Sequence, residues 1–290
     1  MISKSRPSDL VQAIATSGPG FTPKLAMIAR FALEDPESFI RKTSRDICAE
    51  LGTSEPTLIK FCQQFGYSGL SDFRIDLALA LAKHRSGSDF VEPLAGDRRQ
   101  VNLAAKQRIA QAVVGLVADD SSLLIDNGST TEVFAQLLGG PPRTIMTTGI
   151  RVAQNALEHG IHTVMLTGGR IRPNAMSMTG RMVEATIGRM HFDTFVMGAG
   201  AIDADMGLST FQEDEAHNTR FMLDAARRVI VLADSTKFGK PRLHAICGID
   251  RVDVLVTDLD PQDPRFAAIE AQGTHIVSTR NANDLDADPA

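Results

Sequence analysis

The chain has 290 residues, 43% of them hydrophobic and 22% charged, and a formal net charge of −5. These values exclude disorder except at the ends and allow one large domain or two of ordinary size. The apolar runs are too short to cross a bilayer, no secretory signal is visible, and three widely separated cysteines fit reduced thiols, so we expect a cytoplasmic protein with no membrane segment.

The charge is divided unevenly along the chain. Residues 1–85 carry 11 Lys and Arg against 9 Asp and Glu, whereas residues 86–290 carry 19 against 26. A polyanionic partner is therefore expected to meet the first part of the chain.

The first part reads as a series of helices. Residues 1–20 are polar and contain glycine and proline, so we predict a loose lead-in there. Apolar residues then recur at helical spacing from Lys24 to Glu34. A second helix is predicted from Thr43 or Ser44 to Leu51, a third from Ser54 to about Phe65, and a fourth from Leu70 to Lys83.

A helix, a short turn and a second, capped helix form the helix-turn-helix pattern. On the helix that starts at Ser54, Leu58 and Phe61 point to the core, which leaves polar side chains outside. Amide, hydroxyl and basic groups on such a helix suit base edges and phosphates in a major groove. The alternative is an ordinary four-helix packing unit with a polar outer face. The predicted DNA-contacting residues are Ser54, Glu55, Thr57, Lys60 and Gln64.

The stretch from Asp46 to Phe61, followed by Phe65-Gly66-Tyr67-Ser68-Gly69-Leu70 and Phe73, resembles the N-terminal DNA-binding domain of RpiR-type regulators. The resemblance covers about residues 8–84 and implies binding to double-stranded operator DNA. That family usually has an arginine where this chain has Lys60. An ammonium cannot copy the bidentate guanidinium fork, which bears on base preference at that position more than on DNA binding.

Four segments are predicted in all. A helix-turn-helix domain spans residues 1–84, and residues 85–100, which lack periodicity, form a linker. An effector-binding domain spans residues 101–280. The acidic residues 281–290 form a flexible tail.

After a helix over Val101–Val117, strands alternate with helices, which predicts an α/β domain with a mostly parallel sheet covered on both faces. The predicted strands are Ser122–Asp126, Thr144–Thr148, His162–Thr167, Thr194–Gly198, Val229–Ala233, Arg251–Thr257 and Thr274–Val277. The helices predicted between them include Val152–Glu158, Glu213–Ala226 and Pro264–Ala271.

Small, hydroxyl or charged residues follow five of these strands. Each such turn is explained most simply as turn chemistry, but parallel strands bring their carboxyl ends to one edge, where ligands bind. Hydroxyls, backbone N–H groups and cations at one edge suit a small anion. No Walker loop or GxGxxG fingerprint is present, so no nucleotide cofactor is inferred. The residues predicted for this pocket are Asp126, Asn127, Gly128, Ser129, Thr130, Thr131, Thr147, Thr148, Gly168, Gly169, Arg170 and Lys237.

Six motifs stand in order along this half: Leu124-Ile125-Asp126-Asn127-Gly128-Ser129-Thr130-Thr131, Thr147-Thr148, Leu166-Thr167-Gly168-Gly169, Thr179-Gly180, Asp193-Thr194-Phe195 and Leu232-Ala233-Asp234-Ser235-Thr236-Lys237-Phe238-Gly239. Together, over about residues 100–258, they resemble the C-terminal effector domain of DeoR-type regulators. That resemblance implies a Rossmann-like fold akin to ribose-5-phosphate isomerase and glucosamine-6-phosphate deaminase, and a phosphorylated sugar as effector. One departure is Gly149, where the family commonly has asparagine.

The alternative function is a sugar-phosphate isomerase or deaminase, which needs a general base beside the sugar. Asp126, or the run Glu213-Asp214-Glu215 followed by His217, could supply that base. We favour the interpretation that this run forms the acidic first turn of a helix, where the helix dipole stabilises negative charge. In that position Glu213 or Glu215 could still bind a sugar hydroxyl. The pair Glu213 and His217 lacks a third ligand at metal-binding spacing, so no metal site is predicted. No catalytic residue is predicted either.

The sequence therefore predicts a non-enzymatic transcriptional regulator of carbohydrate metabolism genes, a repressor in our interpretation. Its predicted partners are operator DNA and a phosphorylated sugar, with no cofactor. Palindromic operators require at least a dimer, so a homodimer or homotetramer is expected.

Overall fold

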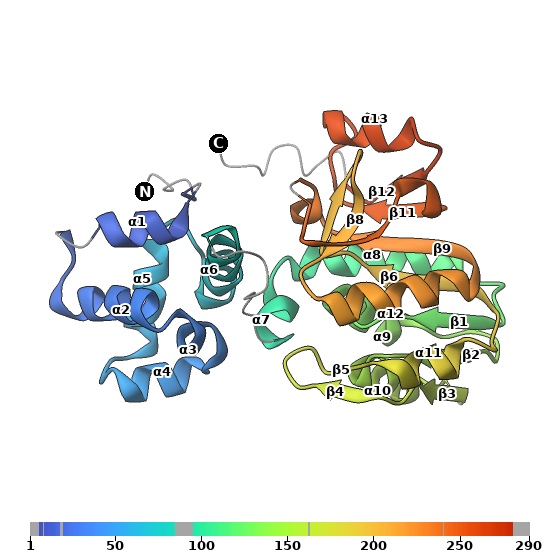
Figure 1. Ribbon diagram of the computed structural model, residues 1–290, viewed down its shortest axis with the longest axis horizontal. Coiled ribbons are helices and arrows are strands. Elements are labelled where there is room, and N and C mark those ends of the chain that lie inside the picture. Colours follow the sequence, from blue (N-terminus) through green and yellow to red (C-terminus); the bar gives the residue numbers. More distant parts are fainter. Residues whose placement is uncertain are drawn as a thin grey trace. The chain divides into compact units, whose positions relative to one another are not determined.

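The computed structural model describes residues 6–7, 9–17, 20–84, 95–161, 163–239 and 241–280, which fold into two compact units that divide between Val101 and Asn102 (Figure 1). The predicted tail, residues 281–290, and residues 85–94 of the predicted linker lie outside the described residues. Within the described ranges, no helix is long and apolar enough to cross a membrane.

The first unit is helical. Phe39, Phe61 and Phe73 are fully buried, and Phe73 lies 5.9 Å from Phe39 and 5.4 Å from Phe61 between ring centroids. These rings join the third, fifth and sixth helices into one core. The helices described in this unit are α1 (Leu10–Thr16), α2 (Pro23–Glu34), α3 (Pro36–Arg41), α4 (Ser44–Glu50), α5 (Glu55–Gln63), α6 (Leu70–His84) and α7 (Ala95–Gln100).

Three of these helices differ from the sequence-based expectation. α1 lies in the predicted lead-in, where Asp9 caps it and Leu10 and Ile14 are buried. α3 follows α2 directly, because Asp35 ends one helix and caps the next. α7 occupies residues 95–100 of the predicted linker, and its Asp97 is buried. Helices of six or seven residues hold too few apolar positions for a periodic signal.

The second unit is built on a seven-stranded sheet, in the order β12-β11-β9-β6-β1-β2-β3, whose neighbours all pair in parallel. Each of the seven strands was predicted, although His162 lies outside the described residues, and the predicted fold class is confirmed. The strands are β1 (Ser122–Ile125), β2 (Thr144–Thr147), β3 (Thr163–Leu166), β6 (Phe192–Gly198), β9 (Ala226–Ala233), β11 (Val254–Thr257) and β12 (His275–Ser278).

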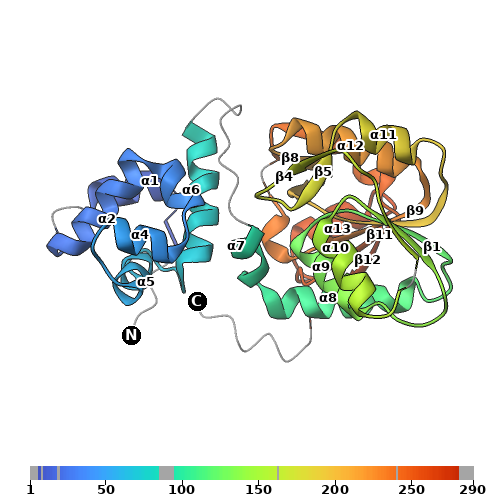
Figure 2. The same cartoon turned by 90° about the horizontal axis from the view of Figure 1, so that it is seen from below.

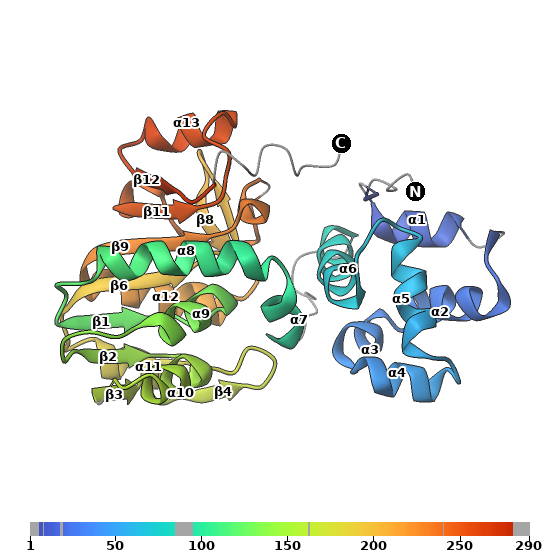
Figure 3. The same ribbon diagram turned by 180° about the vertical axis from the view of Figure 1, so that it is seen from behind.

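Helices cover both faces of this sheet, because successive strand residues point to opposite sides. Leu123 and Ile125 pack with Phe134 in one buried cluster, and Leu124 packs with Val183 in the other. Figure 2 shows α8 on one side of the sheet and α11 and α12 on the other. Figure 3 shows the face of the sheet that α8 and α9 cover. The helices are α8 (Leu103–Leu116), α9 (Ser129–Leu137), α10 (Ile150–Glu158), α11 (Arg181–Ile187), α12 (Glu213–Asp224) and α13 (Pro264–Glu270).

Smaller sheets and turns fill the connections. Their strands have three or four residues, too few to show alternation, and they were not predicted. β4 and β5 form an antiparallel hairpin, and three further strands pair antiparallel in the order β10-β8-β7. They are β4 (Arg170–Arg172), β5 (Ser177–Thr179), β7 (Ala201–Asp203), β8 (Gly207–Thr210) and β10 (His244–Cys247), with 3-10 turns η2 (Ser235–Lys237) and η3 (Ile249–Arg251).

Candidate functional site

Capping residues, a glycine and a proline define the turn between α4 and α5. The Thr43 hydroxyl accepts a hydrogen bond from the Asp46 N–H at 3.2 Å, and the Asp46 carboxylate accepts one from the Thr43 N–H at 3.3 Å. Gly52 follows α4 with φ +58°, a left-handed conformation that glycine adopts at little cost. Pro56 lies in the first turn of α5, where no N–H donor is needed. The two helices are thus held as a helix-turn-helix.

α5 has a buried face and an exposed face. Leu58, Phe61 and Cys62 point into the core of the first unit. The exposed side of α5 is therefore the surface at which a partner could bind. The exposed residues of α5 are Glu55, Pro56, Ile59, Lys60 and Gln63.

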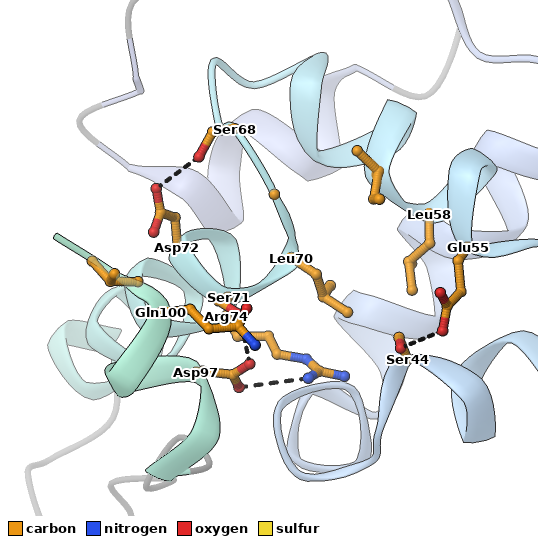
Figure 4. Close-up of a pocket in the computed structure, with 13 residues that line it drawn as sticks. Ser44, Glu55, Leu58, Ser68, Leu70, Ser71, Asp72, Arg74, Asp97 and Gln100 are labelled. Carbon is orange, nitrogen blue, oxygen red and sulfur yellow. Dashed lines mark hydrogen bonds and ion pairs between the residues drawn. The ribbon is translucent and has the colours of Figure 1, made fainter. Parts of the chain in front are cut away.

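The predicted DNA-contacting residues occupy different positions around this face. Lys60 is exposed, as is Ser54, whose hydroxyl lies 2.9 Å from that of Thr57. Glu55 accepts a hydrogen bond from the Ser44 hydroxyl at 2.6 Å, which holds its carboxylate beside α4 (Figure 4). Thr57 is partly buried, and so is Gln64.

Besides Pro56, sequence reasoning missed two exposed side chains of α5. Ile59 and Gln63 follow Glu55 at four-residue intervals, and residues four apart share a helix face. That repeat was the signal available in the sequence. It places Gln63, rather than Gln64, in line with Glu55 on the outer face.

A polar pocket of about 400 Å³ lies beside α5 within the first unit, with Arg74 and Asp97 in its wall (Figure 4). The Arg74 guanidinium is buried and donates to the backbone carbonyls of Phe39, at 3.0 Å, and Lys42. It also pairs with Asp97 at 3.5 Å, and Asp97 accepts from the Ser71 hydroxyl at 2.9 Å. Burial lowers the pKa of Arg74 and raises that of Asp97. The pair fastens α7 to α6 and to the end of α3.

In the second unit, the loop after β1 is organised around Asp126. Its Oδ1 accepts from the Asn127 N–H at 2.8 Å and from the Thr148 hydroxyl at 3.3 Å. Burial first, and then the charge of Glu215, raises the pKa of Asp126 to about 7. A carboxyl that changes charge near neutral pH therefore lies at the carboxyl end of β1.

Two of the threonines predicted for this pocket make hydrogen bonds to backbone groups near them in the chain. The Thr131 hydroxyl donates to the carbonyls of Asp126 at 2.8 Å and Gly128 at 3.0 Å, so it closes the loop on itself. Thr147 is fully buried and its hydroxyl accepts from the Gly149 N–H at 3.0 Å. Thr131 thus holds the loop after β1, and Thr147 holds the turn after β2. Asn127, Gly128 and Ser129 remain partly exposed at the start of α9, while Thr130 is buried.

Gly149 and Gly169 let backbone segments approach closely at this edge, and Gly168 allows a left-handed backbone conformation. Gly168 and Gly169 have φ +78° and +114°, and a Cβ on Gly169 would lie 2.6 Å from the Thr179 carbonyl oxygen. These two residues therefore shape the path into the β4–β5 hairpin. A Cβ on Gly149 would lie 3.1 Å from that of Asn127, so an asparagine at position 149 would displace the β1 loop.

A second polar cluster joins the hairpin to α12. The guanidinium of Arg172 lies 3.8 Å from the Glu215 carboxylate, which accepts from the Thr210 hydroxyl at 2.9 Å. Ser177 stands opposite Arg172 in the hairpin and is fully buried. Its hydroxyl has no hydrogen-bond partner among the described residues. Arg172 and Ser177 were missed because their strands were not predicted.

Two predicted residues point away from this cluster. Arg170 is exposed and pairs with Asp214 at 2.5 Å, and Glu213 is exposed at the start of α12. His217 does not join Glu213, since its Nε2 lies 2.8 Å from the Glu184 carboxylate on α11. No group of three metal-ligating side chains occurs in the described part of the chain.

A third cluster follows β9. The buried carboxylate of Asp234 accepts from the Asn102 amide at 3.1 Å and from the Thr236 N–H at 3.1 Å. Burial opposes its ionisation, but the charges of Lys237 and Lys106 hold the pKa of Asp234 below its usual value, together with hydrogen bonds from the Thr236 hydroxyl and the Asn102 amide. Lys106 is buried on α8 and was not predicted. Two ammonium groups therefore lie near one carboxylate.

The first and third clusters lie at one edge of the sheet, because β1, β6 and β9 run in parallel. The second cluster lies near the first, since the charges of Glu215 and Arg172 act on Asp126. The edge combines carboxylates, which accept from hydroxyls, with the ammonium groups and the start of α9, which attract anions. Such an arrangement suits a small molecule that carries both hydroxyls and a negative charge.

Comparison with known families agrees with both resemblances. The family described as "DeoR C terminal sensor domain" matches residues 101–259. The family described as "Helix-turn-helix domain, rpiR family" matches residues 9–84. The matches cover the stretches on which the sequence-based resemblances were stated, and they confirm them.

Individual relatives are similar to parts of the chain. A putative aga operon transcriptional repressor of Escherichia coli O157:H7 is 37% identical over 188 residues, which is 64% of this chain and 70% of the relative. The glycerol-3-phosphate regulon repressor of Escherichia coli strain K12 is 29% identical over 166 residues, 57% of this chain and 66% of the relative. Ribose 5-phosphate isomerase A of Neisseria gonorrhoeae aligns with a TM-score of 0.35 at 16% identity, over 47% of this chain and 53% of the isomerase.

Proposed function

This chain belongs to the family with a DeoR C-terminal sensor domain, and on that premise we propose how it acts as a transcriptional regulator. Its rpiR-type helix-turn-helix domain binds DNA through α5. The gene set is one of carbohydrate metabolism, the effect is repression, and a phosphorylated sugar is the signal. The observation that carries the proposal is the pairing, in one chain, of an exposed α5 face with a sheet edge suited to a hydroxylated anion.

The phosphate of the effector is proposed to lie between the start of α9 and the ammonium group of Lys237. Backbone N–H groups at a helix start and a cation are the usual phosphate partners. The sugar hydroxyls then face Asp126 and Glu215, whose carboxylates can only accept when ionised. A relative that regulates a glycerol-3-phosphate regulon is consistent with a small phosphorylated polyol as the class of ligand.

The proposed mode of action follows from linkage. If the effector binds the free regulator more tightly than the operator-bound regulator, it lowers operator affinity by the same factor by which DNA lowers effector affinity. We propose that the first unit is the DNA-binding domain and that the chain up to residue 280 completes the effector domain. Two DNA heads are needed for a palindromic operator, so a homodimer or homotetramer in the cytoplasm is proposed.

One observation favours a second candidate function, catalysis on a sugar phosphate. Asp126 has a pKa of about 7, which suits a general base near neutral pH. The fused helix-turn-helix domain and the regulator relatives favour sensing instead.

A single set of samples tests both functions. The protein is mixed with a panel of sugar phosphates and assayed for turnover and for retention of DNA from upstream of its own gene. Loss of DNA retention with one sugar phosphate, without turnover, is the expected result. Turnover in the absence of DNA binding would establish the enzyme instead.

A further inference from the structure

Ile59 is an unusual member of the exposed face of α5. The residue is 40% exposed, although its neighbours Leu58 and Phe61 are buried in the core. It stands between Glu55 and Gln63, one turn away from each, with Lys60 beside it. The centre of the face proposed to meet DNA is therefore apolar.

Ile59 also lines the pocket beside α5, and apart from Pro56 the exposed residues of α5 around it are polar. Glu55 is held beside α4 by its hydrogen bond from Ser44, at 2.6 Å (Figure 4). The ammonium of Lys60 is a point charge that suits a phosphate, and the amide of Gln63 can donate and accept at a base edge. None of these groups makes an apolar contact in a groove.

A single exposed apolar residue needs no explanation on an ordinary surface. On a helix that enters the major groove the position has a consequence, because the methyl carbons of Ile59 would face base edges. The apolar group that the major groove presents is the C5-methyl of thymine. We propose that Ile59 packs against a thymine methyl in the operator and so determines specificity at that base pair. This inference rests on the proposed role of α5 in operator binding.

The test removes only the thymine methyl groups. The DNA from upstream of the gene is amplified with dTTP or with dUTP, and dissociation constants are measured for the full-length wild type and for Ile59→Ala. We expect the wild type to bind the uracil DNA about fourfold more weakly for each methyl contacted, since one buried methyl is worth roughly that factor. Ile59→Ala should bind both DNAs with nearly equal affinity.

Lys60→Ala is the matched control on the same face. It should bind both DNAs more weakly but keep the wild-type ratio between them, because a phosphate contact carries no base information. Thermal unfolding checks that each variant is folded. Should Ile59→Ala unfold, Ile59→Gln, which keeps length and helix propensity, takes its place in the same comparison.

Two outcomes would overturn the inference. One is a wild type that binds thymine and uracil DNA equally well. The other is a folded Ile59 variant that keeps the full wild-type ratio. Failure of the wild type to bind either DNA is a different result, since it rejects the proposed DNA-binding role itself.

Discussion

Replacing Asp126 with asparagine should make the chain more stable at neutral pH and should remove a pH dependence. Asp126 is buried at the carboxyl end of β1, and its pKa is about 7 in the folded state against an ordinary value of 3.8. The folded chain therefore keeps a proton that the unfolded chain releases. Between about pH 4 and pH 7 the folded state binds more protons, so the free energy of unfolding falls as pH rises.

The size of this effect follows from the same values. A rise in pKa from 3.8 to about 7 corresponds to a loss on the order of 4 kcal/mol once both states are ionised. Asparagine keeps an oxygen that can accept from the Asn127 N–H and cannot ionise. The free energy of unfolding of Asp126→Asn, relative to that of the wild type, should thus increase as pH rises through this window.

Scanning calorimetry of both full-length proteins from pH 4 to pH 8 measures the difference. Comparison of the two chains cancels the titration of other carboxyls. Glu215→Gln is the companion variant, because it removes the like charge that helps to raise the pKa of Asp126 and should lower the upper pH limit of this window. A stability difference between wild type and Asp126→Asn that stays constant across the range would refute the reasoning.

Three further predictions concern the two units. Lys60→Ala should weaken operator binding and reduce the slope of log affinity against log salt by about one, as measured by titration at several salt concentrations; an unchanged slope would remove Lys60 from the phosphate contacts. Lys237→Ala should still bind operator DNA but lose its response to the effector in the same retention assay; a normal response would place the phosphate elsewhere. Asp97→Ala should destabilise the first unit by about 3 kcal/mol in chemical denaturation, because it leaves the buried charge of Arg74 without its carboxylate. A change within error would mean that the backbone carbonyls of Phe39 and Lys42 are enough to stabilise the buried guanidinium.

Much of the second unit could be predicted because the central strands of its sheet are largely buried on both faces. Such strands read as short apolar runs, such as Leu123 to Ile125, and turn residues mark their ends. The hairpin of β4 and β5 escaped prediction because strands of three residues carry no periodic signal. Arg172 and Ser177 belong to that hairpin, so these two residues of the candidate site could not be predicted from the sequence.

The candidate site shows the same limit at the level of single side chains. Arg170 and Arg172 lie on one strand, about 7 Å apart at the ordinary rise per residue, and Arg172 is the one beside Glu215. Glu213 and Glu215 are two residues apart on α12, which points them to opposite sides of the helix. In both pairs the residue types were evident from the sequence, but only the packing of α12 against the hairpin selects the member that reaches the cluster.

By itself the sequence determined the order along the chain of the seven parallel strands, the helix-turn-helix and the position of the loop after β1. Those features depend on contacts between near neighbours in the chain, such as caps, turns and apolar runs. Tertiary structure decided which hydroxyls the loop uses for itself, which of two arginines approaches Glu215, and how Lys106 comes near Asp234. These outcomes depend on pairs far apart in the chain, and the free energy of burying a charge is known only once its surroundings are assembled.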